Sequence, residues 1–220
     1  MSKEFVEAVR KNDLAIVKDG IDVGFEVDLV VQGGTSLLMI AAQEGHYEMC
    51  ELLLKNGAKV NAINVRVETA LMLAAEKNKL QICKLLVSNG ATVGKCSLLG
   101  ETALLMAART KNYELIEFLL SKGSDINRQD EDGNTILHLV IPCSNQLVQF
   151  LINSGVDIDL TNDNGFTALM YACSMSNLGN ALTLAQAGAE FQVGYRCAWA
   201  YANQQVTDHL TRHGFIPHNS

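Results

Sequence analysis

The sequence predicts an all-α solenoid, a single elongated domain of stacked helix pairs joined by short hairpin loops. Hydroxyl residues that can cap a helix recur at nearly constant spacing, at Thr35, Thr69, Thr102, Thr135 and Thr167. Glycines suited to ending a helix recur with the same period, at Gly24, Gly57, Gly90, Gly123, Gly155 and Gly188. Between these markers lie short apolar patterns of helical period, each too small to bury its own apolar face without a neighbour.

The clearest copy of the repeated unit spans residues 69–91. Its first half begins at Thr69 and carries an apolar stripe of Leu71, Leu73, Ala74 and Ala75. A break follows at residues 77–79, where Asn78 tolerates the left-handed conformation that ends a helix. The second half ends at Gly90 and has its own stripe, formed by Leu80, Ile82, Cys83, Leu85 and Leu86.

This unit resembles the ankyrin repeat, whose first helix opens on Thr-Pro-Leu-His and whose period is 33 residues. The matching segments are TSLLMIAA from Thr35, TALMLAA from Thr69, TALLMAA from Thr102, TILHLVI from Thr135 and TALMYAC from Thr167. Proline is replaced in every copy, and only His138 keeps the histidine. The resemblance implies an ankyrin-repeat solenoid of stacked helix pairs with short β-hairpin loops over nearly the whole chain.

We expect one domain over residues 1–220, with about seven repeats that include degenerate caps. The expected boundaries are 1–29 (N-terminal cap), 30–63, 64–96, 97–129, 130–161, 162–194 and 195–220 (C-terminal cap). Pro142 interrupts the fifth repeat, so the angle between repeats is expected to change there. Asn180 replaces an aliphatic residue in the sixth repeat, which predicts a looser second helix.

Composition narrows the possible functions. The chain has 220 residues, 48% of them apolar, with no apolar run long enough to cross a membrane and a charged N-terminal segment unlike a signal peptide. We therefore expect a cytoplasmic or nuclear protein without membrane insertion. A net charge of −7 argues against nucleic acid as the main partner. Cys50 and Cys83 occupy equivalent apolar positions, so the cysteines are interpreted as core residues.

Residues that could carry chemistry are few. His46 with Cys50, and His209 with His213, stand four residues apart, but two ligands do not make a metal site. Residues 130–134 imitate the start of a calcium loop, yet Thr135 stands where that loop needs glycine. His138 and Cys143 are the nearest nucleophile and base pair. We predict no enzyme activity, no metal site and no cofactor.

The resemblance implies that binding uses the hairpin tips and the exposed side of the first helices. The apolar candidates are Val31, Val65, Leu98, Leu99, Phe166 and Met175, and the polar candidates are Gln32, Arg66, Arg109, Glu131, Asp132 and Asp163. The alternative is that the valines and leucines pack against adjacent hairpins. If they are exposed, the groove runs from apolar to acidic, which fits a partner segment with apolar anchors followed by Lys or Arg.

Two classes of function remain open. The first is a non-catalytic scaffold or adaptor that binds a protein partner. The second is a regulatory or inhibitory module that controls or delivers a partner enzyme. Asn61 and Asn127 resemble the hairpin asparagines that an asparaginyl hydroxylase modifies in ankyrin repeats, although the same residues also bond the hairpin backbone in unmodified repeats. The oligomeric state is left open.

Overall fold

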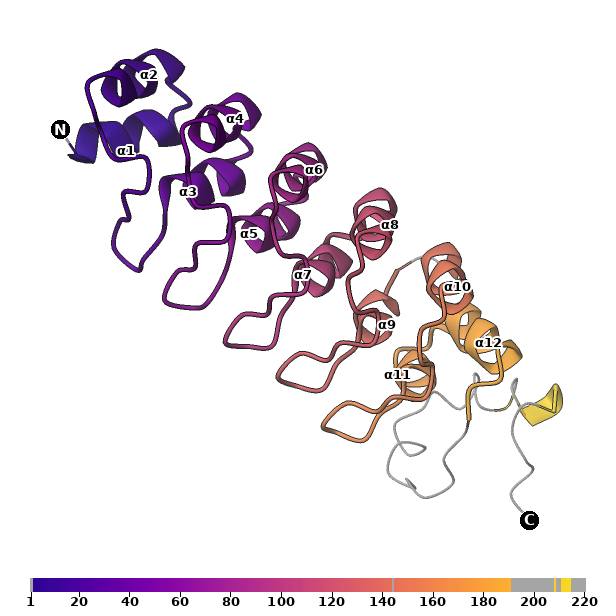
Figure 1. Ribbon diagram of the computed structural model, residues 1–220. Helices are drawn as coiled ribbons and strands as arrows, with labels where there is room; N and C mark the ends of the chain where they lie inside the picture. The colour runs from indigo at the N-terminus through magenta and orange to yellow at the C-terminus, as the bar shows by residue number, and fades with distance from the viewer. Residues whose placement is uncertain (1, 144, 191–207, 209–210, 215–220) are drawn as a thin grey trace. The chain divides into compact units, whose positions relative to one another are not determined.

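The computed structural model describes residues 2–143, 145–190, 208 and 211–214, and within them it contains twelve named α-helices (Figure 1). They are α1 (Ser2–Arg10), α2 (Leu14–Asp22), α3 (Leu37–Glu44), α4 (Tyr47–Lys55), α5 (Ala70–Glu76), α6 (Leu80–Ser88), α7 (Ala103–Thr110), α8 (Tyr113–Ser121), α9 (Ile136–Val140), α10 (Asn145–Asn153), α11 (Ala168–Ser174) and α12 (Leu178–Gln186). The predicted all-α class and repeated helix pairs are confirmed. The expected C-terminal cap, residues 195–220, lies almost wholly outside the described residues.

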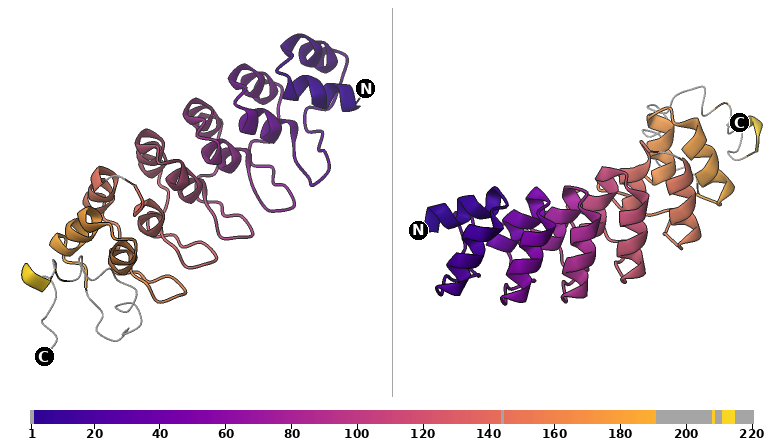
Figure 2. Two further views of the ribbon diagram at one scale, coloured as in Figure 1. Left: turned by 180° about the vertical axis from the view of Figure 1, so that it is seen from behind. Right: turned by 90° about the horizontal axis from the view of Figure 1, so that it is seen from above.

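Contacts group the chain into two compact units, Met1–Ser124 and Asp125–Ser220. In the first unit, α1, α3, α5 and α7 form one row and α2, α4, α6 and α8 form another (Figures 1 and 2). The loops that precede α3, α5 and α7 project on the side of the first row. In the second unit, α9 packs on α11 and α10 packs on α12.

Hydroxyl caps start the first helices, as the spacing predicted, with one correction. The N–H of Met72 donates to Thr69 Oγ1 (3.3 Å), and Thr102 and Thr167 cap their helices in the same way. In the second repeat the cap is Ser36 and not Thr35, because the N–H of Met39 donates to Ser36 Oγ (3.2 Å). The step from Ser36 to Thr69 is then 33 residues, the regular period.

The core lies between the two helix rows and is built by the predicted stripes. The third residue of each of the helices α4, α6, α8, α10 and α12 is buried in this core, and these residues are Met49, Ile82, Leu115, Leu147 and Asn180. Buried cysteines support the same core, and burial raises the pKa of the Cys50, Cys83 and Cys173 thiols to about 12. These thiols are therefore protonated packing groups at neutral pH.

Asn180 does not loosen α12 as expected. Its side chain is 1% exposed, and Nδ2 donates to the carbonyls of Ile141 (2.7 Å) and Cys143 (3.2 Å). Helix α9 ends at Val140 after five residues, just before Pro142, whereas α3, α5, α7 and α11 have seven or eight. The asparagine thus supplies donors to backbone carbonyls beyond the end of the shortened helix.

No helix among the described residues combines the length and the apolar character that a membrane span requires.

Candidate binding surface at the hairpin tips

Backbone hydrogen bonds close the hairpins, and in the hairpins after the first a polar side chain at the base adds to them, so the tip side chains are not needed to hold the loop. In the hairpin that precedes α5, the N–H of Asn64 donates to the carbonyl of Glu68 (3.1 Å). Asn64 Oδ1 accepts from the N–H groups of Arg66 (2.9 Å) and Glu68 (3.0 Å). Val65 and Arg66 form the tip, and their side chains are exposed.

The first hairpin has a different register from the one the Thr35 alignment implied. The N–H of Val31 donates to the carbonyl of Thr35 (2.9 Å), so Val31 is the equivalent of Asn64 and stands at the base. Gln32 and Gly33 form the tip. Val31 is half-buried and Gln32 is exposed.

Three apolar candidates share one surface in the first unit. The N–H of Val65 donates to the carbonyl of Gly33 (3.0 Å), and the N–H of Leu98 donates to the carbonyl of Arg66 (2.9 Å). These bonds hold successive tips side by side. Val65 is 69% exposed, Leu98 is 67% exposed and Leu99 is 45% exposed. We call Val65, Leu98 and Leu99 the tip surface. Packing between adjacent hairpins does not bury it.

A polar pocket of about 320 Å³ adjoins these hairpins and is lined by Arg66, Glu68, Glu76, Glu101, Met106, Arg109 and Thr110. Arg66 donates through Nε (3.0 Å) and Nη2 (2.9 Å) to Glu68 Oε2, which also accepts from Asn64 Nδ2 (2.7 Å). Glu101 forms an ion pair with Arg109. Both carboxylates are buried, whereas both guanidinium groups are exposed.

The pocket therefore presents two positioned arginines, because Arg66 and Arg109 each form an ion pair with a buried carboxylate, Glu68 and Glu101 respectively. Sequence reasoning selected Arg66 and Arg109 but missed that Glu68 and Glu101 hold them. The available signal was that both glutamates stand directly before a helix-capping threonine, so they lie at the base of a hairpin.

The candidates of the second unit form an acidic surface. The N–H of Asp163 donates to the carbonyl of Asp132 (3.0 Å), so these tips are neighbours, and Glu131, Asp132 and Asp163 are exposed. Residues 125–220 carry nine acidic and three basic residues, whereas residues 1–124 carry fifteen and fourteen. The net charge of −7 is thus concentrated in the second unit.

The structure places the other two candidates of this unit differently. Phe166 is half-buried, and its carbonyl accepts from His138 Nε2 (2.9 Å). Met175 is 46% exposed at the C-terminal end of α11. Of the two, only Met175 presents a largely accessible side chain.

The residues considered for metal binding or catalysis have structural partners. Asp130 Oδ1 accepts from the N–H groups of Asp132 (3.1 Å) and Asn134 (2.8 Å), so it closes a turn. His138 uses Nδ1 toward Thr135 and Nε2 toward Phe166. His46 Nε2 lies 2.8 Å from the carbonyl oxygen of Arg10. No group of three metal-ligating residues occurs in the described part of the chain, which excludes His209.

The two candidate modification sites link adjacent repeats. Asn61 donates through Nδ2 to the carbonyl of Gly90 (2.9 Å) and accepts at Oδ1 from the N–H of Thr92 (2.8 Å). Asn127 Oδ1 accepts from the N–H of Asp157 (2.8 Å). Each amide thus has the backbone-bonding role that was the alternative to hydroxylation.

Among the described residues, paired helices of regular period, hydroxyl caps on α3, α5, α7 and α11, and hairpins linked within each unit define a helical repeat protein. The family model of ankyrin repeats, which describes three copies at a time, matches residues 5–97, 62–130 and 104–194. The chain belongs to the ankyrin-repeat family.

Among solved structures, the chain is similar to one in the complex of a predatory endopeptidase from Bdellovibrio bacteriovorus with an immunity protein. The two are 30% identical with a TM-score of 0.76, over 83% of this chain and 96% of that one. No curated protein matches the sequence.

Proposed function

We propose that this chain is a non-catalytic scaffold or adaptor that binds a segment of a partner protein through the tip surface. The exposure of Val65, Leu98 and Leu99 carries this proposal, because three large apolar side chains lie in water on adjacent, backbone-linked hairpins. Exposed apolar side chains that lie together are typical of interaction sites.

The chemistry of the surface indicates what the partner carries. Apolar residues on the partner would be buried against the tip surface and would supply most of the affinity. The acidic tips of the second unit favour Lys or Arg elsewhere in the partner, and long-range attraction of this kind acts mainly on orientation and association rate. A segment with apolar anchors followed by basic residues meets both requirements.

The test starts with affinity capture from the native cell lysate, using the wild type and a double variant, Leu98→Ser with Leu99→Ser. The matched control replaces Ile16 and Val23 by Ser, since both are exposed apolar residues of the same unit outside the tip surface. For a captured partner we expect at least about tenfold weaker binding by the tip variant, equivalent to about 1.4 kcal/mol, and no change in the control.

The midpoint of thermal unfolding separates binding from folding in this test. It should be nearly unchanged in both double variants, because exposed side chains contribute little to stability. A collapsed fold in the tip variant, or equal weakening by the control, contradicts the proposal.

The charge contribution needs a separate measurement. Glu131→Gln with Asp132→Asn should flatten the dependence of the association rate on salt, because the attraction that salt screens is then smaller. An unchanged salt dependence would exclude these two carboxylates from partner attraction.

The second candidate function is a regulatory or inhibitory module. The solved complex named above favours it, because that complex pairs a peptidase with an immunity protein. The distinguishing experiment adds the purified chain to the captured partner and measures the partner's enzyme activity. If the wild-type chain lowers the partner's enzyme activity and the Leu98 and Leu99 double variant does not, the chain is a regulatory or inhibitory module. If the wild-type chain leaves the activity unchanged, the result supports the scaffold.

A further inference from the structure

Among the described residues, the first hairpin is an open edge of its unit. In the first unit each later tip donates one backbone hydrogen bond to the hairpin before it, from Val65 to Gly33 and from Leu98 to Arg66. The equivalent donor of the first hairpin is the N–H of Gln32. No described residue accepts a hydrogen bond from it. The row of linked hairpins thus ends with a main-chain donor that points to no acceptor within the described chain.

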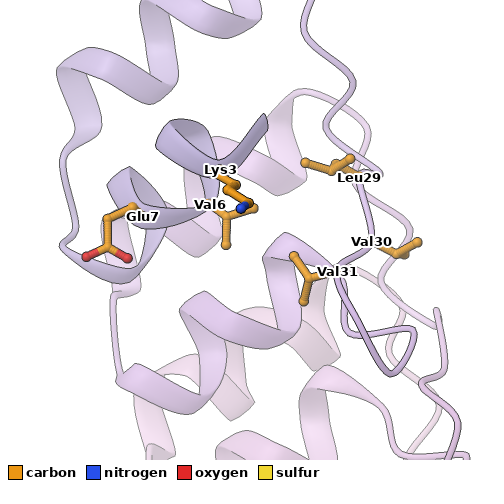
Figure 3. Close-up of a pocket in the computed structure, with 6 residues that line it drawn as sticks. All are labelled: Lys3, Val6, Glu7, Leu29, Val30 and Val31. Carbon is orange, nitrogen blue, oxygen red and sulfur yellow. The ribbon is translucent and has the colours of Figure 1, made fainter. Parts of the chain in front are cut away.

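A pocket of about 420 Å³ lies beside this edge, between α1 and the first hairpin. Its lining is mainly aliphatic and consists of Lys3, Val6, Glu7, Leu29, Val30 and Val31 (Figure 3). In Figure 3, Lys3 and Val6 of α1 face the segment that carries Leu29 and Val31, and Glu7 lies on the other side. Val30 is 57% exposed, and Val6, Leu29 and Val31 are half-buried.

The charges of the pocket favour an anion. The carboxylate of Glu7 lies 3.2 Å from Lys11 Nζ, so its charge is balanced on α1 itself. Lys3 is the cation of this lining and has no ion-pair partner among the described residues. A carboxylate beside the pocket would therefore gain attraction from Lys3 without competing with an existing ion pair.

We propose that this edge binds an extended segment of a partner protein, with a backbone carbonyl accepting from the N–H of Gln32, one aliphatic side chain in the pocket and a neighbouring carboxylate near Lys3. Addition of an extended segment to an open edge is an established mode of peptide binding, in which main-chain bonds give affinity and side-chain pockets give selectivity. The site continues the row of linked hairpins and is separate from the tip surface of the proposed function.

The turn of the first hairpin allows the main-chain donor to be removed selectively. The N–H of Gly34 donates to the carbonyl of Val31 (3.0 Å), and Gly33 has a φ of +83°. These features are those of a type II turn with Gln32 in its second position, where proline is common. Gln32→Pro therefore deletes the N–H with little change to the turn.

The experiment uses eight-residue acetylated peptides of alternating Ser and Thr that carry one Leu followed by Asp, and the same peptides with Lys in place of Asp. Binding is followed by the NMR amide and methyl signals of the full chain. We expect the Asp peptides to shift the Gln32 amide and the Val6 and Val31 methyl signals, with at least fivefold weaker binding of the Lys peptides. Gln32→Pro should weaken binding at least tenfold. Leu98→Ser with Leu99→Ser should leave it unchanged.

A matched pair of variants tests the charge. Lys3→Glu should reverse the preference between Asp and Lys peptides, whereas Lys18→Glu makes the same charge change on the exposed face of α2 and should not. Three results overturn the proposal: equal binding by Gln32→Pro, equal effects of the two lysine variants, or a wild-type dimer that Gln32→Pro dissociates. The last would make a second copy of the chain the occupant.

Discussion

Because Asn180 Nδ2 donates to two backbone carbonyls beyond the shortened helix α9, we expect its removal to destabilise the second unit. The change Asn180→Asp keeps the shape of the side chain but replaces the Nδ2 donor by a carboxylate oxygen. That oxygen would face the carbonyl oxygens of Ile141 and Cys143, which lie 2.7 Å and 3.2 Å from Nδ2 in the wild type. Asn180 Oδ1 is buried without a hydrogen-bond partner among the described residues, so the other side offers no compensation.

Two costs add at pH 7. The loss of two hydrogen bonds costs about 1–3 kcal/mol, and a buried charge without a partner costs about 3–5 kcal/mol. The chain can avoid part of the second cost by protonating the carboxyl group, so its pKa in the folded state is raised above the unfolded value of about 3.9. We therefore expect a loss of about 3–5 kcal/mol at pH 7. The stability of the variant should be highest below about pH 4 and should decrease as the pH rises through the folded pKa.

Urea unfolding by circular dichroism at several pH values, with hydrogen exchange to locate the affected helices, measures this effect. The control is Asn153→Asp, because Asn153 is an exposed asparagine of α10 in the same unit and its change should stay within about 0.5 kcal/mol. If both variants have the same stability at pH 7, or the same dependence on pH, the two hydrogen bonds of Asn180 do not stabilise the shortened repeat as inferred.

Three further predictions concern other parts of the stack. Burial lowers the pKa of His138, against the opposing effects of its bond to the Phe166 carbonyl and the charge of Asp130. The folded state therefore disfavours protonation, so the wild type should lose unfolding free energy as the pH falls below about 6.5, and His138→Gln should lack this decrease in urea titrations. Val67 has a φ of +60° where other hairpins have glycine. Val67→Gly should relieve about 1–2 kcal/mol and lose about 0.5–1 kcal/mol in chain entropy, for a small rise in the thermal midpoint, and a fall would show that the conformation is not strained. Leu104 is fully buried, so Leu104→Ala should cost about 2–5 kcal/mol by urea unfolding, and a cost below 1 kcal/mol would place it outside the core.

The sequence predicted the helices well because capping hydroxyls, apolar stripes and terminal glycines all repeat with one period. It misplaced the first hairpin by one residue because Thr35 and Ser36 are both able to cap a helix. Two observations identify Ser36 as the cap. Its hydroxyl accepts from the N–H of Met39, and the step from Ser36 to Thr69 is the regular 33 residues. Comparing all five helix starts for the most regular spacing would have found this register.

The role of Asn180 could not be predicted from its own repeat. A polar residue in an apolar stripe is unfavourable when only its own helix is considered. Its partners, Ile141 and Cys143, lie 39 and 37 residues earlier in the chain, on either side of Pro142. Pro142 in the fifth repeat and Asn180 in the sixth thus belong to one structural feature. Each residue looks unfavourable when only its own repeat is considered.

The sequence predicted where the candidate surface lies, but it did not predict which residues hold its side chains in place. Hairpin closure uses backbone groups and a base residue such as Asn64 or Asp130, so the tip residues can vary without cost to the fold. An exposed apolar residue at such a position is therefore informative, since folding does not require it. The first hairpin differs from the later hairpins of its unit: the Val65 and Leu98 N–H groups donate to the hairpin before them, whereas the Gln32 N–H has no acceptor among the described residues. In a stack whose stability depends on neighbours, an edge with a main-chain donor and an aliphatic pocket is chemically suited to a neighbour that another chain supplies.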